Sequence, residues 1–135
     1  MNLYDKDDGF KQFTLLEANR LLPKINETTK YAVEELEKIT QAFETSKILD
    51  EDSAQHQFEI ETADILQQWT EDMIRLGVYP KGYFTVDFKT SIPDTLFCWT
   101  FGEKEVTHTH KVYENFKRRV PIRDKKLSGF EDSLN

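Results

Sequence analysis

Two histidines separated by a single residue, His108 and His110, are the side chains best placed to do chemistry together. Residues i and i+2 of a β-strand point to the same face, so both imidazoles could bind one divalent metal ion. Two ligands are too few for a metal site, and the third would come from Asp87, from His56 or from a glutamate such as Glu105. The alternative is a pair of half-exposed polar side chains, because this spacing is weakly specific.

Carboxylates and arginines lie close to these histidines, within the segment Phe97–Ile122. Glu103 and Glu105 could act as a general acid and base, which requires one carboxyl group with a raised pKa. The sequence does not indicate that either is buried, so solvated strand charges are the favoured alternative.

Arg118 and Arg119 belong to a basic stretch, residues 111–126, that holds seven lysines and arginines. Guanidinium groups bind carboxylate and phosphate through paired hydrogen bonds, so the two arginines could bind an anion. We favour the alternative that they pair with acidic side chains of this chain or of a second subunit.

The single cysteine, Cys98, lies between two aromatic residues of an expected strand, where a buried thiol is usually inert packing. The chain has no nucleophile elbow, no phosphate-binding loop and no dinucleotide fingerprint. The sequence therefore assigns no catalytic residue and leaves open whether the protein is an enzyme.

Composition and charge narrow the class of protein. The chain has 135 residues and a net charge of -7, with 17 acidic and 8 basic residues in positions 1–80. An acidic surface disfavours nucleic acid and anionic membrane as partners. With no signal-peptide pattern and no long apolar run, we expect a cytoplasmic protein.

Two long helices are expected in the first part of the chain. Thr14 and Glu17 have the spacing of a capping box, and a seam of apolar residues at heptad spacing follows as far as about Lys47. Pro23 predicts a kink or break in this helix. A second amphipathic helix is expected from about Ser53 to Leu76, so the two form an antiparallel hairpin. The seam residues are Leu15, Ala18, Leu22, Ile25, Thr29, Ala32, Leu36, Ile39 and Phe43.

After Gly77 the pattern changes to strands, expected at 83–88, 95–101 and 105–110, with a final helical turn at 113–118. The predicted fold class is α+β: a helical hairpin packed against a small antiparallel sheet of about three strands. We expect a flexible lead at 1–12, one domain at 13–123 and a flexible tail at 124–135.

Two segments, FTLLEANRLLP at 13–23 and LFCWTFGEKEVTHTHKVYENFKRRVPI at 96–122, resemble a bacterial family known as domain of unknown function 2203. The chain departs from the family pattern at His108 and Thr109, where the family has aromatic residues, and at Asn115, where it usually has glycine. His108 therefore carries less weight than His110. The resemblance implies no established activity, but it implies that five polar residues converge: Asp87, Glu103, Glu105, His110 and Arg119.

Three classes of function follow, in order of preference. The first is a noncatalytic module that binds a ligand or partner as a homodimer. The second is a metal-dependent enzyme, hydrolase-like, in which Asp87, Glu105, His108 and His110 bind the ion. The third is a structural or regulatory protein that interacts through its helical hairpin.

Overall fold

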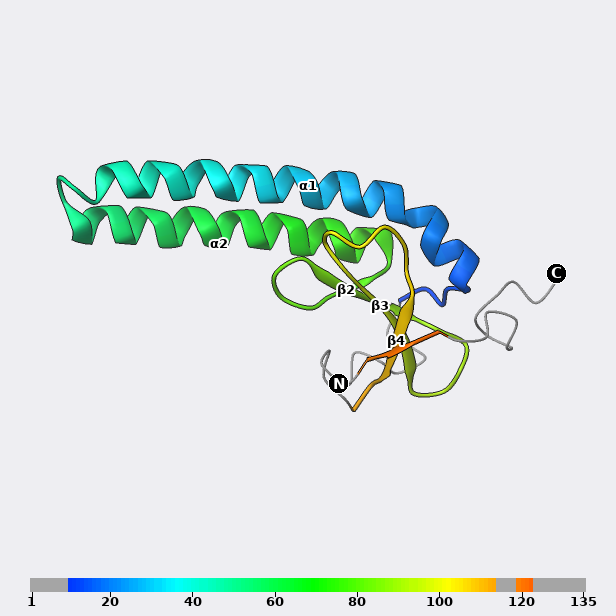
Figure 1. Ribbon diagram of the computed structural model, residues 1–135. Coiled ribbons are helices and arrows are strands. Elements are labelled where there is room, and N and C mark those ends of the chain that lie inside the picture. The colour runs from blue at the N-terminus through cyan, green and yellow to red at the C-terminus, as the bar shows by residue number, and fades with distance from the viewer. Residues whose placement is uncertain (1–9, 114–118, 123–135) are drawn as a thin grey trace.

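The computed structural model describes residues 10–113 and 119–122. Its largest element is an antiparallel hairpin of two helices, α1 (Leu15–Ser46) and α2 (Glu51–Leu76) (Figure 1). Thr14 and Glu17 form the expected capping box, and Asp50 caps α2 by accepting a hydrogen bond from the Ser53 N–H. Gly77 ends α2 in the left-handed conformation with φ of 91°, which glycine adopts without a steric penalty.

Pro23 lies inside α1, and the helix continues through it. The N-terminal part of α1, drawn in dark blue, turns away from the line of the rest of the helix (Figure 1). A proline removes one hydrogen-bond donor and crowds the preceding turn, which accounts for a bend without a break.

The second half of the chain forms one antiparallel sheet with the strand order β1-β2-β3-β4-β5. The predicted α+β class is confirmed. The third predicted strand begins later than expected, at His108, and two edge strands of two residues each were not predicted. The strands are β1 (Tyr79–Pro80), β2 (Thr85–Lys89), β3 (Thr95–Thr100), β4 (His108–Lys111) and β5 (Val120–Pro121).

One face of the sheet packs against the end of the hairpin where α1 begins and α2 finishes (Figure 1). Aromatic and branched side chains of β2 and β3 meet the inner faces of both helices there. Thr29, the polar member of the predicted seam, is fully buried and accepts a hydrogen bond of 2.9 Å from the Trp69 indole. The main contributors to this core are Ala18, Ile25, Trp69, Met73, Val86, Phe88, Phe97 and Trp99.

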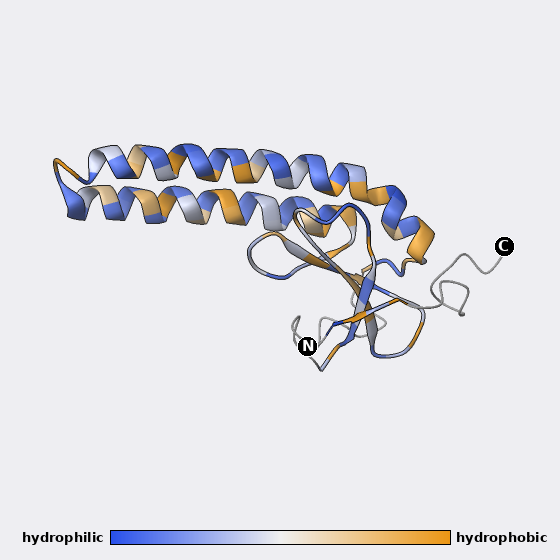
Figure 2. Ribbon diagram, viewed as in Figure 1, coloured by the Kyte–Doolittle hydropathy of each residue, from blue (hydrophilic) through white to orange (hydrophobic). Residues whose placement is uncertain are grey.

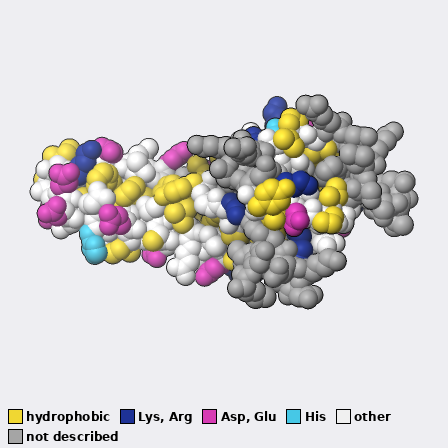
Figure 3. Space-filling view, turned by 90° about the horizontal axis from the view of Figure 1, so that it is seen from below, with side chains coloured by type: hydrophobic (Ala, Val, Ile, Leu, Met, Phe, Trp, Pro, Cys, Tyr) yellow, Lys and Arg dark blue, Asp and Glu magenta, His cyan; other side chains and the backbone are white. Residues whose placement is uncertain are grey.

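The rest of the hairpin, which we call the arm (residues 31–68), extends beyond the sheet, and no other described helix or strand lies alongside it (Figure 1). Hydrophobic bands recur along both helices of the arm (Figure 2). Seen from below, hydrophobic side chains lie at the surface of the arm among acidic ones (Figure 3). Seam residues Leu36, Ile39 and Phe43 are therefore only partly buried.

Several predictions concern residues outside the described ranges. These are the tail at 124–135, most of the lead at 1–12, and the helical turn at 113–118 apart from Tyr113. Of the lead, Gln12 forms a parallel bridge with Lys89, and the Phe10 ring lies 4.2 Å from that of Tyr79. Within the described ranges, neither helix has the combination of length and apolar character that crossing a membrane requires.

Candidate functional site

The sheet face opposite the helices carries a group of polar side chains, which we call the polar face. Strand register places Asp87 opposite Cys98, and Cys98 opposite His108, in one row across β2, β3 and β4. His110 lies in the next row, opposite Leu96. Residues that are opposite each other in antiparallel strands point to the same face, so these side chains share one side of the sheet.

His110 and Asp87 form a buried pair on the polar face. The imidazole Nε2 lies 3.0 Å from Asp87 Oδ1, and the two side chains are only 4% and 1% exposed. His110 Nδ1 lies 2.9 Å from the Lys111 carbonyl oxygen, which can only accept a hydrogen bond. Nδ1 therefore carries a proton, and with an ionised Asp87 the imidazole carries a second proton on Nε2.

The electrostatic effect of this pair agrees with that geometry. The hydrogen bond to Asp87 raises the pKa of His110 above its usual value, although burial and the positive charge of Lys81 act in the opposite direction. Asp87 Oδ2 is buried and has no hydrogen-bond partner among the described residues. Both nitrogens of His110 are occupied, so neither is free to take a proton from a substrate.

Glu103 and Arg119 form a second pair beside the first. The guanidinium binds the carboxylate through both nitrogens, with Nη1–Oε1 at 3.1 Å and Nη2–Oε2 at 2.8 Å. The Thr100 backbone N–H also donates to Glu103 Oε1, at 2.8 Å. Burial opposes ionisation of Glu103, but the bonds from Arg119 and Thr100 outweigh it and lower the pKa of this carboxyl.

Cys98 lies between these two pairs, in hydrogen-bond contact with Arg119. Burial, followed by the negative charge of Asp87, raises the pKa of the thiol to about 12. Because the thiolate is the nucleophile, a thiol with this pKa is unreactive near neutrality. The geometry agrees with the prediction that Cys98 is packing.

Of the five residues predicted to converge, the structure brings four to the polar face as two pairs. Glu105 is exposed in the loop between β3 and β4, apart from them. His108 and His110 share a face, as predicted, but no cluster of three potential ligands that could hold a metal ion occurs in the described part of the chain. His56 is exposed on α2, His108 Nδ1 lies 2.8 Å from the Thr107 hydroxyl, and Arg118 is outside the described residues.

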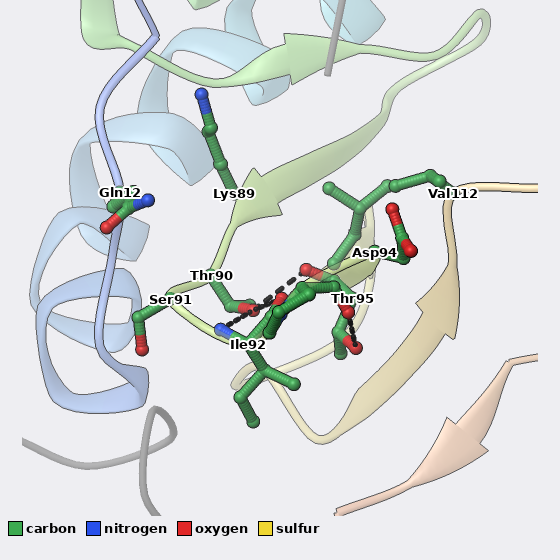
Figure 4. A pocket seen from close by; sticks show the side chains of 10 residues that line it. Gln12, Lys89, Thr90, Ser91, Ile92, Asp94, Thr95 and Val112 are labelled. Carbon is green, nitrogen blue, oxygen red and sulfur yellow. Dashed lines mark hydrogen bonds between the residues drawn. The ribbon is translucent and has the colours of Figure 1, made fainter. Parts of the chain in front are cut away.

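A pocket of about 290 Å³ lies at the turn between β2 and β3 (Figure 4). The hydroxyls of its two threonines are both hydrogen-bonded. The Thr90 hydroxyl donates to the Thr95 carbonyl at 2.8 Å and accepts from the Ile92 N–H, while the Thr95 hydroxyl accepts from Lys111 Nζ. The Lys89 side chain extends away from the turn (Figure 4). The two threonine hydroxyls of this pocket are therefore already engaged within the turn and its neighbouring strand.

A larger groove, of about 630 Å³, lies between α1 and the loop 101–105. It brings together the two segments on which the family resemblance rests, which are separated by more than 70 residues in sequence. The Asn19 side chain accepts a hydrogen bond of 2.7 Å from the Val106 N–H across this junction. Sequence reasoning missed Lys30 and Lys104 in this groove, since neither forms part of a motif.

The fold and its polar face define a class: small α+β proteins with a helical hairpin on one side of an antiparallel sheet and buried polar pairs on the other. Within that class the chain belongs to the family described as an uncharacterized conserved protein, DUF2203, whose model matches residues 11–122. The match spans both helices and all five strands, so the resemblance inferred from the sequence is confirmed. No curated protein and no solved structure matches the chain.

Proposed function

We propose that this protein is a noncatalytic binding module that works as a homodimer, with the arm as the surface between the two copies. The chemistry of the polar face supports the noncatalytic part. General acid–base catalysis needs a group that is free to exchange a proton with substrate. His110 has both nitrogens bonded, Glu103 is held by Arg119, and the Cys98 thiol is buried with a pKa of about 12.

The main support for a dimer is that apolar side chains of the arm are exposed. Among the described residues the arm has no third layer, so part of its apolar seam lies in water, and burial of that area drives association. Tyr31 is 67% exposed and Ile60 is 44% exposed. Between the helices lies a hollow of about 330 Å³. Its apolar part is formed by Tyr31, Ala32, Ile65 and Trp69, and its polar lining residues are Thr28, Glu35, Asp64, Gln68 and Asp72.

A second copy of the chain suits this surface better than an unrelated partner. Two hairpins that pack their seams together make a four-helix bundle, the usual arrangement for helices of this length and pattern. A two-fold dimer needs a self-complementary patch, and the arm offers one aromatic projection, Tyr31, next to one apolar hollow. The Tyr31 ring of each copy would fill space in the hollow of the other.

The test compares two tyrosines with matched exposure. Tyr31→Glu places a charge in the proposed interface, and Tyr83→Glu is the control, because Tyr83 is 66% exposed in the segment between β1 and β2. Light scattering after size exclusion should give the wild type and Tyr83→Glu twice the 16.0 kDa chain mass, and Tyr31→Glu a single chain. Circular dichroism checks that all three are folded.

Two results would remove the proposal. One is a wild-type protein that stays at a single chain mass at every concentration tested. The other is a Tyr31→Glu variant that is folded and as dimeric as Tyr83→Glu.

A further inference from the structure

The groove between α1 and the loop 101–105 has the features of a ligand site that is independent of the arm. Asn19, Pro23 and Lys30 contribute one wall from α1, and Phe101, Lys104 and Glu105 contribute the other. Both walls carry polar as well as apolar groups, so a small molecule with a polar and an apolar part would find contacts for each.

Both ends of the loop wall are held in place. At one end, Glu103 is bound by Arg119 and by the Thr100 N–H, and its carbonyl accepts a hydrogen bond of 2.8 Å from the Trp99 indole. At the other end, the Val106 N–H donates to Asn19 on α1. A loop fixed at both ends loses little freedom when a ligand binds, and this lowers the entropic cost of binding.

In the opposite wall, one backbone carbonyl of α1 lacks its usual helical hydrogen-bond donor. Pro23 has no N–H, so it cannot donate to the Asn19 carbonyl four residues earlier, which would be its helical partner. The Pro23 ring is exposed beside it, and the half-buried Phe101 ring lies on the other wall. The groove thus combines an apolar ring on each wall with polar groups next to it.

The charges of the groove favour an anion. Within the described residues, neither Lys30 nor Lys104 forms an ion pair with an acidic side chain. Glu103 is neutralised by Arg119, so Glu105 is the remaining carboxylate of the lining. Two uncompensated ammonium groups against one carboxylate leave the groove with a net positive charge on an otherwise acidic protein.

We propose that this groove binds a small organic carboxylate, with the anionic group between Lys30 and Lys104 and the apolar part against Phe101 and Pro23. Ammonium groups bind carboxylates as flexible point charges, which suits two lysines on facing walls. Glu105 opposes the ligand charge and limits affinity.

Benzoate is a suitable probe, and benzamide is its neutral isostere. Nuclear magnetic resonance of the ¹⁵N-labelled full chain follows the Gly102 amide and the Trp99 indole, which lies against the loop. Benzoate should shift both signals to saturation and benzamide should not. K30Q/K104Q should weaken benzoate binding by about tenfold, since an exposed ion pair accounts for a few-fold each. Glu105→Gln should tighten it by about threefold.

Lys24→Gln is the matched control, because Lys24 is an exposed lysine of α1 outside the groove lining and its loss should leave benzoate affinity unchanged. Equal binding of benzamide and benzoate would overturn the proposal. So would the absence of saturable shifts, or a folded K30Q/K104Q that binds benzoate as the wild type does.

Discussion

His110, paired with Asp87, keeps its second proton to a higher pH than an exposed histidine does, because the hydrogen bond to Asp87 raises its pKa. Both ring nitrogens face acceptors, a carboxylate oxygen at 3.0 Å and a carbonyl oxygen at 2.9 Å, so the doubly protonated ring satisfies both. Loss of one proton would leave a buried acceptor facing a ring nitrogen that no longer donates, which is costly in a dry environment. This pair therefore links the stability of the sheet to pH.

We predict that the fold becomes less stable as pH rises above neutrality. The folded-state pKa of His110 is raised above its unfolded value of about 6.5. The stabilisation is therefore complete below about pH 6.5 and is lost as pH rises through the folded pKa. Urea denaturation at a series of pH values should show the free energy of unfolding falling over this range.

Two histidine variants separate this effect from general titration. His110→Gln should be less stable than the wild type at pH 6 and should lose most of the pH dependence, whereas His56→Gln, changed at an exposed position of α2, should keep it. A wild-type stability that is constant from about pH 6 to pH 9 would contradict the assignment of the proton to His110.

At the scale of elements, the helices could be predicted because each has apolar residues at helical spacing and residues that mark its ends. The capping box at Thr14, the acidic turn before α2 and Gly77 are all local features. Strands β1 and β5 could not be predicted, since two residues are too short to show an alternation. Their existence depends on neighbours that are distant in sequence.

The candidate site, too, could be predicted only in part. Alternation along a strand placed His108 and His110 on one face, but the partner of His110 depends on the register of β2 against β3 and β4. A slip of one residue would have turned Asp87 to the opposite face. The family resemblance placed Glu105 in the polar set, yet it lies in a loop where strand alternation does not apply.

The buried hydrogen bond between Thr29 of α1 and Trp69 of α2 can be tested by substitution. Thr29→Val keeps the shape but removes the acceptor for the buried Trp69 indole N–H, which should cost about 1–3 kcal/mol in the free energy of unfolding. The control is Thr40→Val, at an exposed position of the same helix where the hydroxyl bonds only to the Leu36 carbonyl. Equal urea midpoints for the two variants would mean that this hydrogen bond does not stabilise the hairpin.

For the whole molecule, two opposing effects decide whether two arms associate: repulsion between acidic side chains and burial of apolar surface. Helix α2 carries seven acidic residues and one arginine. Two such helices brought together in a homodimer repel each other, while the seam between them attracts. Repulsion between exposed charges is screened by salt, whereas burial of apolar surface is not weakened by it.

The most direct test of the proposed dimer is sedimentation equilibrium of the wild-type chain at low and high salt. Raising the salt from about 0.01 M to about 1 M shortens the screening length from about 30 Å to about 3 Å. We predict a monomer–dimer equilibrium whose average mass rises toward twice the 16.0 kDa chain mass, with tighter association at high salt. A single chain mass at both salt concentrations, or a dimer that dissociates as salt is added, would contradict association through the apolar seam of the arm.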